Sequence, residues 1–322
     1  MNPALSVLFF STLSGAGYGL LFWSAVLALT GGSRPQPQPL PLLVATLVAL
    51  VLVSVGLVSS LFHLGKPQRA WRAFSQWRTS WLSREGVAAV ATYVPALLLT
   101  ALLWLEDLDP TSFVFSARPS LLLVAVCVAL AASAMVTVAC TAMIYASLTP
   151  IPAWRHRLVV PVYLLFALCT GGLLVMALAP QDGARLGTAA AMIAMALVVV
   201  LVLMKWRYWR DIDGATLPAT RGAAVGLPKR TVSVFERPHT DANYITREMA
   251  FVVARKHARW LRRLAVLLFA LLPLLCMLPV WLFAHLDATP WFAIAAASAI
   301  SGAFVERWLF FAEARHMVTL YY

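Results

Sequence analysis

The chain has 322 residues, of which 61% are hydrophobic and only 12% are charged. Soluble globular proteins carry about 25% charged residues, so this composition excludes a soluble domain and indicates a helical protein that crosses a membrane several times. The formal net charge of +12 does not indicate nucleic-acid binding, because most basic residues gather in three loops between apolar segments. The positive-inside rule predicts this pattern, and we expect lipid rather than nucleic acid around the chain.

Eight apolar segments reach the length of about 20 residues that a transmembrane helix needs. They cover residues 4–30, 40–62, 85–105, 119–146, 158–180, 186–206, 262–285 and 290–312. The first segment has no basic region before it and no good cleavage site after it, so we expect it to be a retained helix. Glycines 15, 17 and 19 within it predict close packing against a neighbouring helix. The whole chain, 1–322, is therefore predicted to be a single all-α membrane domain, with a long connection at residues 205–261.

The basic residues also predict an orientation. Twenty of them lie in or beside the loops after the second, fourth and sixth segments, and three lie in the loops on the opposite side. This asymmetry places both termini and the three basic loops in the cytoplasm.

The connection between the second and third segments is basic and rich in aromatic residues. Trp71, Phe74 and Trp81 recur there at intervals close to the helical period. Such a pattern favours a short amphipathic helix that lies in the membrane interface. An ordinary belt of interfacial aromatic residues is the alternative.

His63 and Glu85 are the main candidates for a functional site. They stand where the second segment ends and the third begins, so both are expected at the same face of the membrane, close enough to approach each other. Reduction of a quinone headgroup requires groups that exchange protons at the edge of the hydrocarbon, and His and Glu can do so. Arg69 could polarise a quinone carbonyl. In the structural alternative, His63 only marks the interface and Glu85 stabilises the start of a helix beside Ser83 as its cap.

Several further residues are accessory candidates. Arg84 and Trp71 belong to the same connection as Arg69. Glu306 and Arg307 lie inside the last apolar segment, where they are expected to pair with another helix rather than face lipid. Glu306 is predicted either to extend a proton path or to form a structural ion pair.

No residue pattern suggests a metal or a catalytic centre in this chain. The four cysteines lie singly within apolar segments, without metal-binding spacing. No histidine lies near mid-membrane, where paired haem ligands would be needed. We therefore expect no haem, no iron–sulfur cluster and no catalytic residue, and any redox centre would belong to a partner.

The stretch Phe62-His63-Leu64-Gly65-x-Pro67-x-Arg69-Ala70, with Glu85 22 positions after the histidine, resembles the anchor subunits of dimethyl sulfoxide reductase. These belong to a wider family of quinone-reactive anchors, and the resemblance covers the whole chain. It implies an eight-helix anchor in the bacterial cytoplasmic (inner) membrane. It also implies a docked four-cluster iron–sulfur subunit, a molybdopterin catalytic subunit, and exchange of electrons with ubiquinone or menaquinone. The family's His and Glu correspond to His63 and Glu85.

Three stretches, 69–78, 80–86 and 306–314, are similar to the branch of this family that anchors cytoplasmic sulfite–quinone oxidoreductases. The predicted orientation agrees, because it turns the polar loops towards the cytoplasm. This similarity implies that electrons from sulfite oxidation reach quinone through the chain. The alternatives are a quinol-oxidising anchor of a reductase, a transporter, and a structural anchor without a quinone site.

Overall fold

A computed structural model of the chain describes residues 4–30, 39–62, 64–108, 119–178, 184–215, 219–233, 235–236, 253–283 and 285–320. Within these ranges all regular secondary structure is helical. Eight helical spans of the described residues are long and apolar enough to cross a membrane. The predicted all-α architecture with eight transmembrane helices is therefore confirmed.

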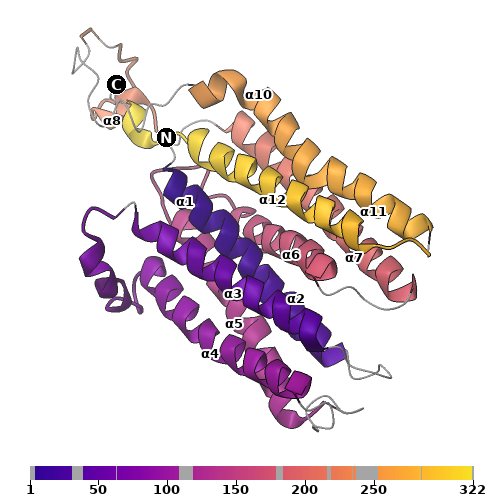
Figure 1. Ribbon diagram of the computed structural model, residues 1–322. Coiled ribbons are helices and arrows are strands. Elements are labelled where there is room, and N and C mark those ends of the chain that lie inside the picture. The colour runs from indigo at the N-terminus through magenta and orange to yellow at the C-terminus, as the bar shows by residue number, and fades with distance from the viewer. Residues whose placement is uncertain are drawn as a thin grey trace.

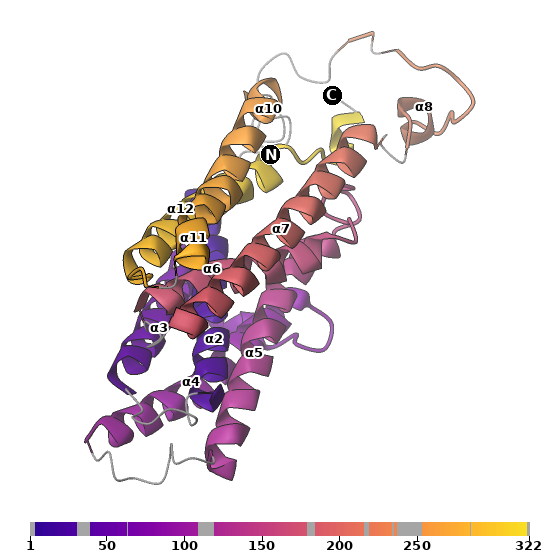
Figure 2. The same cartoon turned by 90° about the vertical axis from the view of Figure 1, so that its right-hand side faces the viewer.

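The spans follow one another in chain order, and two of them contain a single π-helical turn. They are α1–η1–α2 (Leu5–Phe9, Phe10–Ser14, Gly15–Thr30), α3 (Pro39–Leu61), α4 (Trp81–Leu108), α5 (Leu121–Ala146), α6 (Val159–Leu178), α7 (Ala184–Gly214), α10–η5–α11 (Val253–Val266, Leu267–Leu271, Leu272–Leu282) and α12 (Thr289–Ala312). Among the described residues, three short helices lie outside them: η3 (Pro67–Phe74), α8 (Arg221–Ala224) and η6 (Met317–Leu320). Both chain ends lie at the same end of the bundle, the end that also carries α8 and the start of α10 (Figure 1, Figure 2). We call this the terminus-bearing end.

Helix α2 occupies the centre of the bundle, where it packs against α3, α5 and α6. It crosses α6 at very short range, because a Cβ atom added at Gly19 would fall 1.8 Å from the carbonyl oxygen of Ala167. A Cβ at Gly171 would fall 2.1 Å from the carbonyl carbon of Gly19. Gly17 meets α3 in a similar way, whereas Gly15 has nothing within 4 Å. The predicted close packing through small residues thus holds for Gly17 and Gly19 but not for Gly15.

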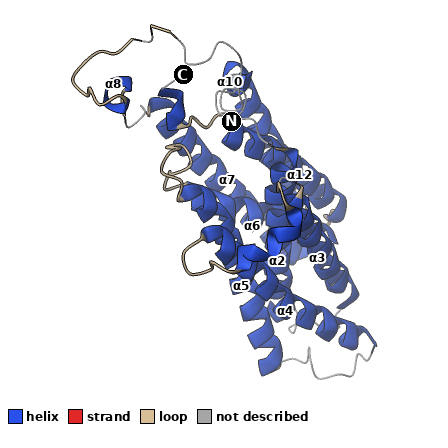
Figure 3. Ribbon diagram, turned by 90° about the vertical axis from the view of Figure 1, so that its left-hand side faces the viewer, coloured by secondary structure: helices blue, strands red, loops and turns tan. Residues whose placement is uncertain are grey.

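Three helix boundaries differ from the sequence-based ones by about four residues or more. Helix α4 begins at Trp81 instead of residue 85, α7 continues to Gly214 instead of ending at 206, and α10 begins at Val253 instead of 262. The predicted connection 205–261 therefore starts and finishes as helix (Figure 3). The reason for α7 is that neither glycine nor proline occurs between Gly187 and Gly214, so nothing ends the helix near residue 206. Long basic and aromatic side chains also let a helix continue beyond the hydrocarbon.

The connection between α3 and α4 contains η3, a 3₁₀-helix that begins at Pro67. Its large aromatic side chains are exposed: 66% for Trp71, 43% for Phe74 and 52% for Trp77. Phe74 lies against the start of α4, since a Cβ at Gly86 would be 3.3 Å from its ring. This segment has the exposed aromatic face expected of a helix in the membrane interface.

Candidate functional site

Glu85 lies inside the bundle near the terminus-bearing end. Its side chain is 6% exposed, and its Oε1 accepts a hydrogen bond from the hydroxyl of Thr141 on α5 at 2.5 Å. Because α4 begins at Trp81 and Ser83 is already within it, Ser83 does not cap the helix and Glu85 lies beyond the first turn. The structural alternative for Glu85 is therefore wrong, since helix-dipole stabilisation is confined to that turn. A buried ionisable group in a membrane helix is a functional candidate.

Arg84, the preceding residue, turns towards the interfacial connection. Its Nε donates to the carbonyl of Trp77 at 3.0 Å, and its Nη2 donates to the carbonyl of Arg78 at 2.6 Å. The guanidinium also lies over the ring of Trp81, 4.3 Å from the centroid. Arg84 thus holds the end of this connection against α4, which is a structural task rather than contact with Glu85.

The other predicted members of the site lie elsewhere or outside the described residues. Arg69 is exposed on η3, and Trp71 is exposed beneath the guanidinium of Arg72, 5.6 Å from the ring centroid. No side-chain contact joins Arg69 to Glu85 in the part of the chain that the structure describes. His63 falls outside the described residues, so its approach to Glu85 stays a prediction.

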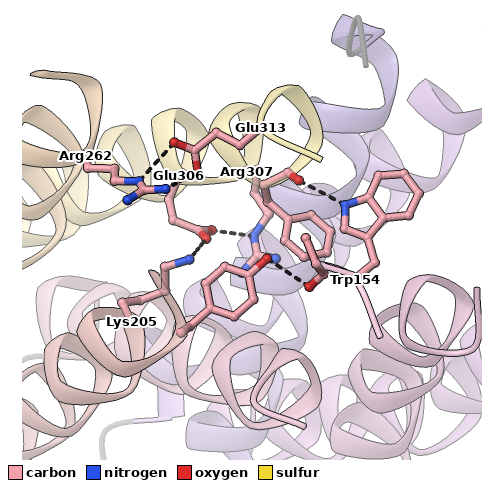
Figure 4. A network of polar contacts seen from close by, with 9 residues as sticks. Trp154, Lys205, Arg262, Glu306, Arg307 and Glu313 are labelled. Atoms are coloured by element: carbon pink, nitrogen blue, oxygen red, sulfur yellow. Dashed lines mark hydrogen bonds and ion pairs between the residues drawn. The ribbon is translucent and has the colours of Figure 1, made fainter. Parts of the chain in front are cut away.

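A second buried ionic cluster contains Glu306. Oε1 of Glu306 lies 2.5 Å from Nζ of Lys205 on α7, and its Oε2 lies 3.2 Å from Nε of Arg307 (Figure 4). All three side chains are at most 3% exposed. Arg307 stacks on Tyr163 of α6, with 3.6 Å between the guanidinium carbon and the ring centroid. The prediction that Glu306 and Arg307 pair with other helices rather than face lipid is confirmed, because Glu306 contacts Lys205 of α7 and Arg307 contacts Tyr163 of α6. Lys205 is thus a buried partner rather than a loop residue.

An ion-pair network nearer the surface continues this cluster. Nε of Arg262 on α10 lies 2.9 Å from Oε1 of Glu313 (Figure 4). Nη1 of the same arginine donates to Asp213 of α7 at 2.6 Å. The Glu313 side chain is largely buried, and burial raises the pKa of its carboxyl group. The Asp213 side chain is 60% exposed. The network joins α7, α10 and the end of α12 at the terminus-bearing end.

A small cavity with several polar side chains in its wall lies between Thr141, the partner of Glu85, and Arg307 of the Glu306 cluster. Its polar lining includes Thr12 and Ser14 of η1, Tyr18 of α2, Thr141 of α5, Tyr163 of α6 and Arg307 of α12. We call it the Arg307 cavity. It offers about 20 Å³ to the centres of water molecules, which is room for roughly one or two of them. This space is too small for a quinone headgroup.

A larger apolar cavity lies between α2, α6 and α7. It offers about 170 Å³ on the same measure, and it extends from Trp23 past Met176 to Leu197. The indole nitrogen of Trp23 is already used, because it donates to the carbonyl of Leu168 at 2.9 Å. This cavity is suited to apolar chains, and the residues that line it include no carboxyl, imidazole or hydroxyl group.

The sequence alone does not point to Thr141, Tyr163 or Lys205. A threonine in an apolar helix usually returns its hydroxyl to its own backbone, and the carbonyl of Thr137, 3.1 Å from the hydroxyl of Thr141, is the local acceptor that competes with Glu85 for its single proton. Lys205 follows an apolar run and resembles the start of a basic loop, and its partner Glu306 is 101 positions away. No spacing rule joins residues so distant in the chain.

The described residues contain no group of three or more His, Cys, Asp and Glu side chains that could hold a metal ion. The four cysteines, Cys127, Cys140, Cys169 and Cys276, are free and buried in separate positions. The described residues instead form a buried carboxyl–hydroxyl pair, Glu85 with Thr141, and a buried ionic cluster of Lys205, Glu306 and Arg307.

Comparison with known proteins agrees with this architecture. Residues 1–312 match the family described as DMSO reductase anchor subunit (DmsC). The chain is also 32% identical over 324 residues to a sulfite dehydrogenase subunit of Allochromatium vinosum, an alignment that covers 100% of this chain and 99% of that protein. This protein is thus a multi-pass membrane anchor of an oxidoreductase, and it belongs to the DMSO reductase anchor subunit family.

Proposed function

We propose that this chain is the quinone-reactive membrane anchor of a sulfite-oxidising complex. A docked four-cluster iron–sulfur subunit passes electrons to the anchor, and a molybdopterin subunit oxidises sulfite in the cytoplasm. Support for the substrate comes from the name of the Allochromatium vinosum relative, which is a subunit of a sulfite dehydrogenase. The whole chain, 1–322, acts as one anchor domain in the bacterial inner membrane, and ubiquinone or menaquinone is the electron acceptor.

The observation that carries this proposal is the position of Glu85. Its buried carboxyl group lies in α4 directly behind the interfacial connection, where Phe74 packs against Gly86. A quinone that enters from the membrane would meet the exposed aromatic side chains of that connection first. Reduction of a quinone takes up two electrons and two protons, and a carboxyl group at the edge of the hydrocarbon can deliver a proton.

The chain's own residues would divide the work as follows. Glu85 exchanges protons, and the hydroxyl of Thr141 fixes the orientation of its carboxyl group. His63 supplies a second proton-exchanging group, and Arg69 lies near the headgroup from η3. Arg84 keeps the connection next to α4 through its two carbonyl contacts.

The basic face of the chain supports cytoplasmic docking. The polar loops at the terminus-bearing end hold most of the Lys and Arg residues, and the positive-inside rule turns such loops to the cytoplasm. A basic surface attracts a partner with an acidic patch. We therefore place the iron–sulfur subunit against this end.

Purification of the complex from its native membrane, by a tag on this chain, tests the proposal. We expect molybdenum and iron in the eluate and sulfite-dependent reduction of an added quinone. Glu85→Gln should lower that turnover by about 100-fold, the scale of a lost proton-exchanging group. Asp107→Asn changes an exposed carboxylate at the opposite end of the same helix, α4, and as the control it should leave the rate unchanged.

Each other result has a defined meaning. Turnover driven only by a sulfoxide or similar oxidant would identify a quinol-oxidising anchor instead. Full quinone-coupled turnover in an intact Glu85→Gln complex would exclude the proposed site. Absence of both metals from an intact preparation would refute the anchor complex itself.

A further inference from the structure

We propose that the Arg307 cavity is a hydrated proton-relay site that serves Glu85. In this proposal Thr141 is the relay hydroxyl and Arg307 is the positioning residue that holds the water. The inference rests on the proposed function, because it needs Glu85 as the group that exchanges protons with quinone.

The first argument is the set of buried polar atoms that meet no partner of hydrogen-bond geometry among the described residues. They include the hydroxyls of Thr12 and Tyr18 and both terminal nitrogens of Arg307. Each of these residues lines the cavity and is at most 5% exposed. Buried polar groups without a protein partner are usually satisfied by water, which makes about three hydrogen bonds in such sites. Donors and acceptors that converge on one small space therefore indicate bound water.

The backbone of the first span supports the same conclusion. The π-helical turn η1 runs from Phe10 to Ser14 and places Thr12 and Ser14 in the cavity wall. Ser14 returns its hydroxyl to the carbonyl of Phe10 at 2.6 Å, but Thr12 does not do so. Such π-bulges are rare and occur frequently at functional sites.

The cavity meets Glu85 through one side chain. Thr141 lines the cavity and donates its hydroxyl proton to Oε1 of Glu85 at 2.5 Å. A hydroxyl can accept a hydrogen bond while it donates one. Thr141 can therefore accept from cavity water on one side and donate to the carboxyl group on the other.

Arg307 lines the cavity and also belongs to the ionic cluster. It pairs with Glu306, and Glu306 pairs with Lys205. Two cations and one anion leave a single positive charge inside the bundle. When Glu85 gives up its proton, its carboxylate balances that charge across the cavity. Directly after α12, Glu313 pairs with Arg262 of α10 nearer the surface.

Each group in the relay ends in the protonation state in which it began. When Glu85 has delivered a proton, Thr141 passes its hydroxyl proton to the carboxylate and takes one from the cavity water. The water regains its proton from the aqueous phase at the terminus-bearing end. Arg307 orients the water without losing a proton, because its guanidinium stays charged.

Thr141→Val tests the relay in the intact complex, because valine keeps the shape and removes the hydroxyl. We expect quinone-coupled turnover to fall about tenfold, which is less than the loss of a direct proton-exchanging group, and its solvent isotope effect in D₂O to increase. Thr141→Ser should restore most of the rate. Thr137→Val is the matched control, since Thr137 is equally buried in α5, one turn away, and does not line the cavity.

The outcomes separate this inference from the proposed function. If Glu85→Gln abolishes turnover while Thr141→Val behaves like Thr137→Val, the relay is refuted and the quinone site stands. If Glu85→Gln has no effect, the proposed site itself is refuted. Metal content of each preparation shows whether the complex is assembled.

A second measurement uses the unaltered protein and does not depend on turnover. A structure of the complex at a resolution that shows ordered water should have density within hydrogen-bond distance of the terminal nitrogens of Arg307 and the hydroxyl of Tyr18. A dry cavity, or side chains that close it, would overturn the proposal even if Thr141→Val failed to assemble.

Discussion

The buried cluster of Lys205, Glu306 and Arg307 predicts an asymmetry between two substitutions. Glu306 is the only anion in the cluster and contacts both cations, at 2.5 Å and 3.2 Å. Glu306→Gln leaves two buried cations on the order of 6 Å apart, which repel by about 3 kcal/mol at an effective dielectric constant of 20. Loss of one member of a buried ion pair typically costs about 3–5 kcal/mol. Lys205→Met instead leaves the pair of Glu306 and Arg307 intact, and methionine fills the space of the lysine stem.

We expect Glu306→Gln to lower the free energy of unfolding by about 3–5 kcal/mol and Lys205→Met by only about 1 kcal/mol, the scale of one hydrogen bond. The assay is heat-induced loss of folded protein in mild detergent, followed by fluorescence-detected size-exclusion chromatography. At about 2 °C per kcal/mol, the glutamine variant should lose folded protein several degrees below the methionine variant. The exposed Glu236→Gln is the control. Equal losses for the two buried variants would refute the reasoning.

Two further predictions follow from the packing. Gly19→Ala places a methyl group 1.8 Å from the carbonyl oxygen of Ala167, so α2 and α6 cannot keep their spacing. Expression tests should therefore recover little folded protein. Gly15→Ala, with nothing within 4 Å, is the control and should be tolerated. Normal yields of both variants would contradict the close crossing. Arg84→Met removes the two hydrogen bonds to carbonyls of the interfacial connection. Limited chymotrypsin digestion should then cut this connection faster than in the unaltered protein, and an unchanged rate would show that Arg84 does not hold it.

Membership of the anchor family argues against the transporter alternative. The structure also gives the buried charges a different explanation from a transport path. Glu306 and Arg307 pair with each other and with Lys205 near the end of α12. This arrangement joins α7 to α12 at one end of the bundle, where the anchor is proposed to meet its partners.

The predicted site shows what sequence patterns can and cannot determine. The place of Glu85 at the start of a span identifies it as a candidate, and its burial agrees with a functional role. Its partner Thr141 lies 56 positions further along the chain, so no local pattern could join them. Arg69 is expected near Glu85 because both flank the same connection, but η3 leaves Arg69 exposed. Arg69 and Glu85 are therefore close in sequence, but no side-chain contact joins them in the described structure.

The sequence by itself determined the number of spans, because about 20 apolar residues cross the hydrocarbon and no other regular structure satisfies the backbone there without neighbours. It also determined the family, through motifs that stay close together along the chain. Only the tertiary structure decided that Lys205 pairs with Glu306, that Thr141 reaches Glu85, and that a polar cavity lies between them. The physical reason is that helix periodicity orients side chains around one axis, whereas contacts between helices depend on how closely the axes approach. Where α2 crosses α6 and α3, that approach is set by glycines whose partners lie on the other helix.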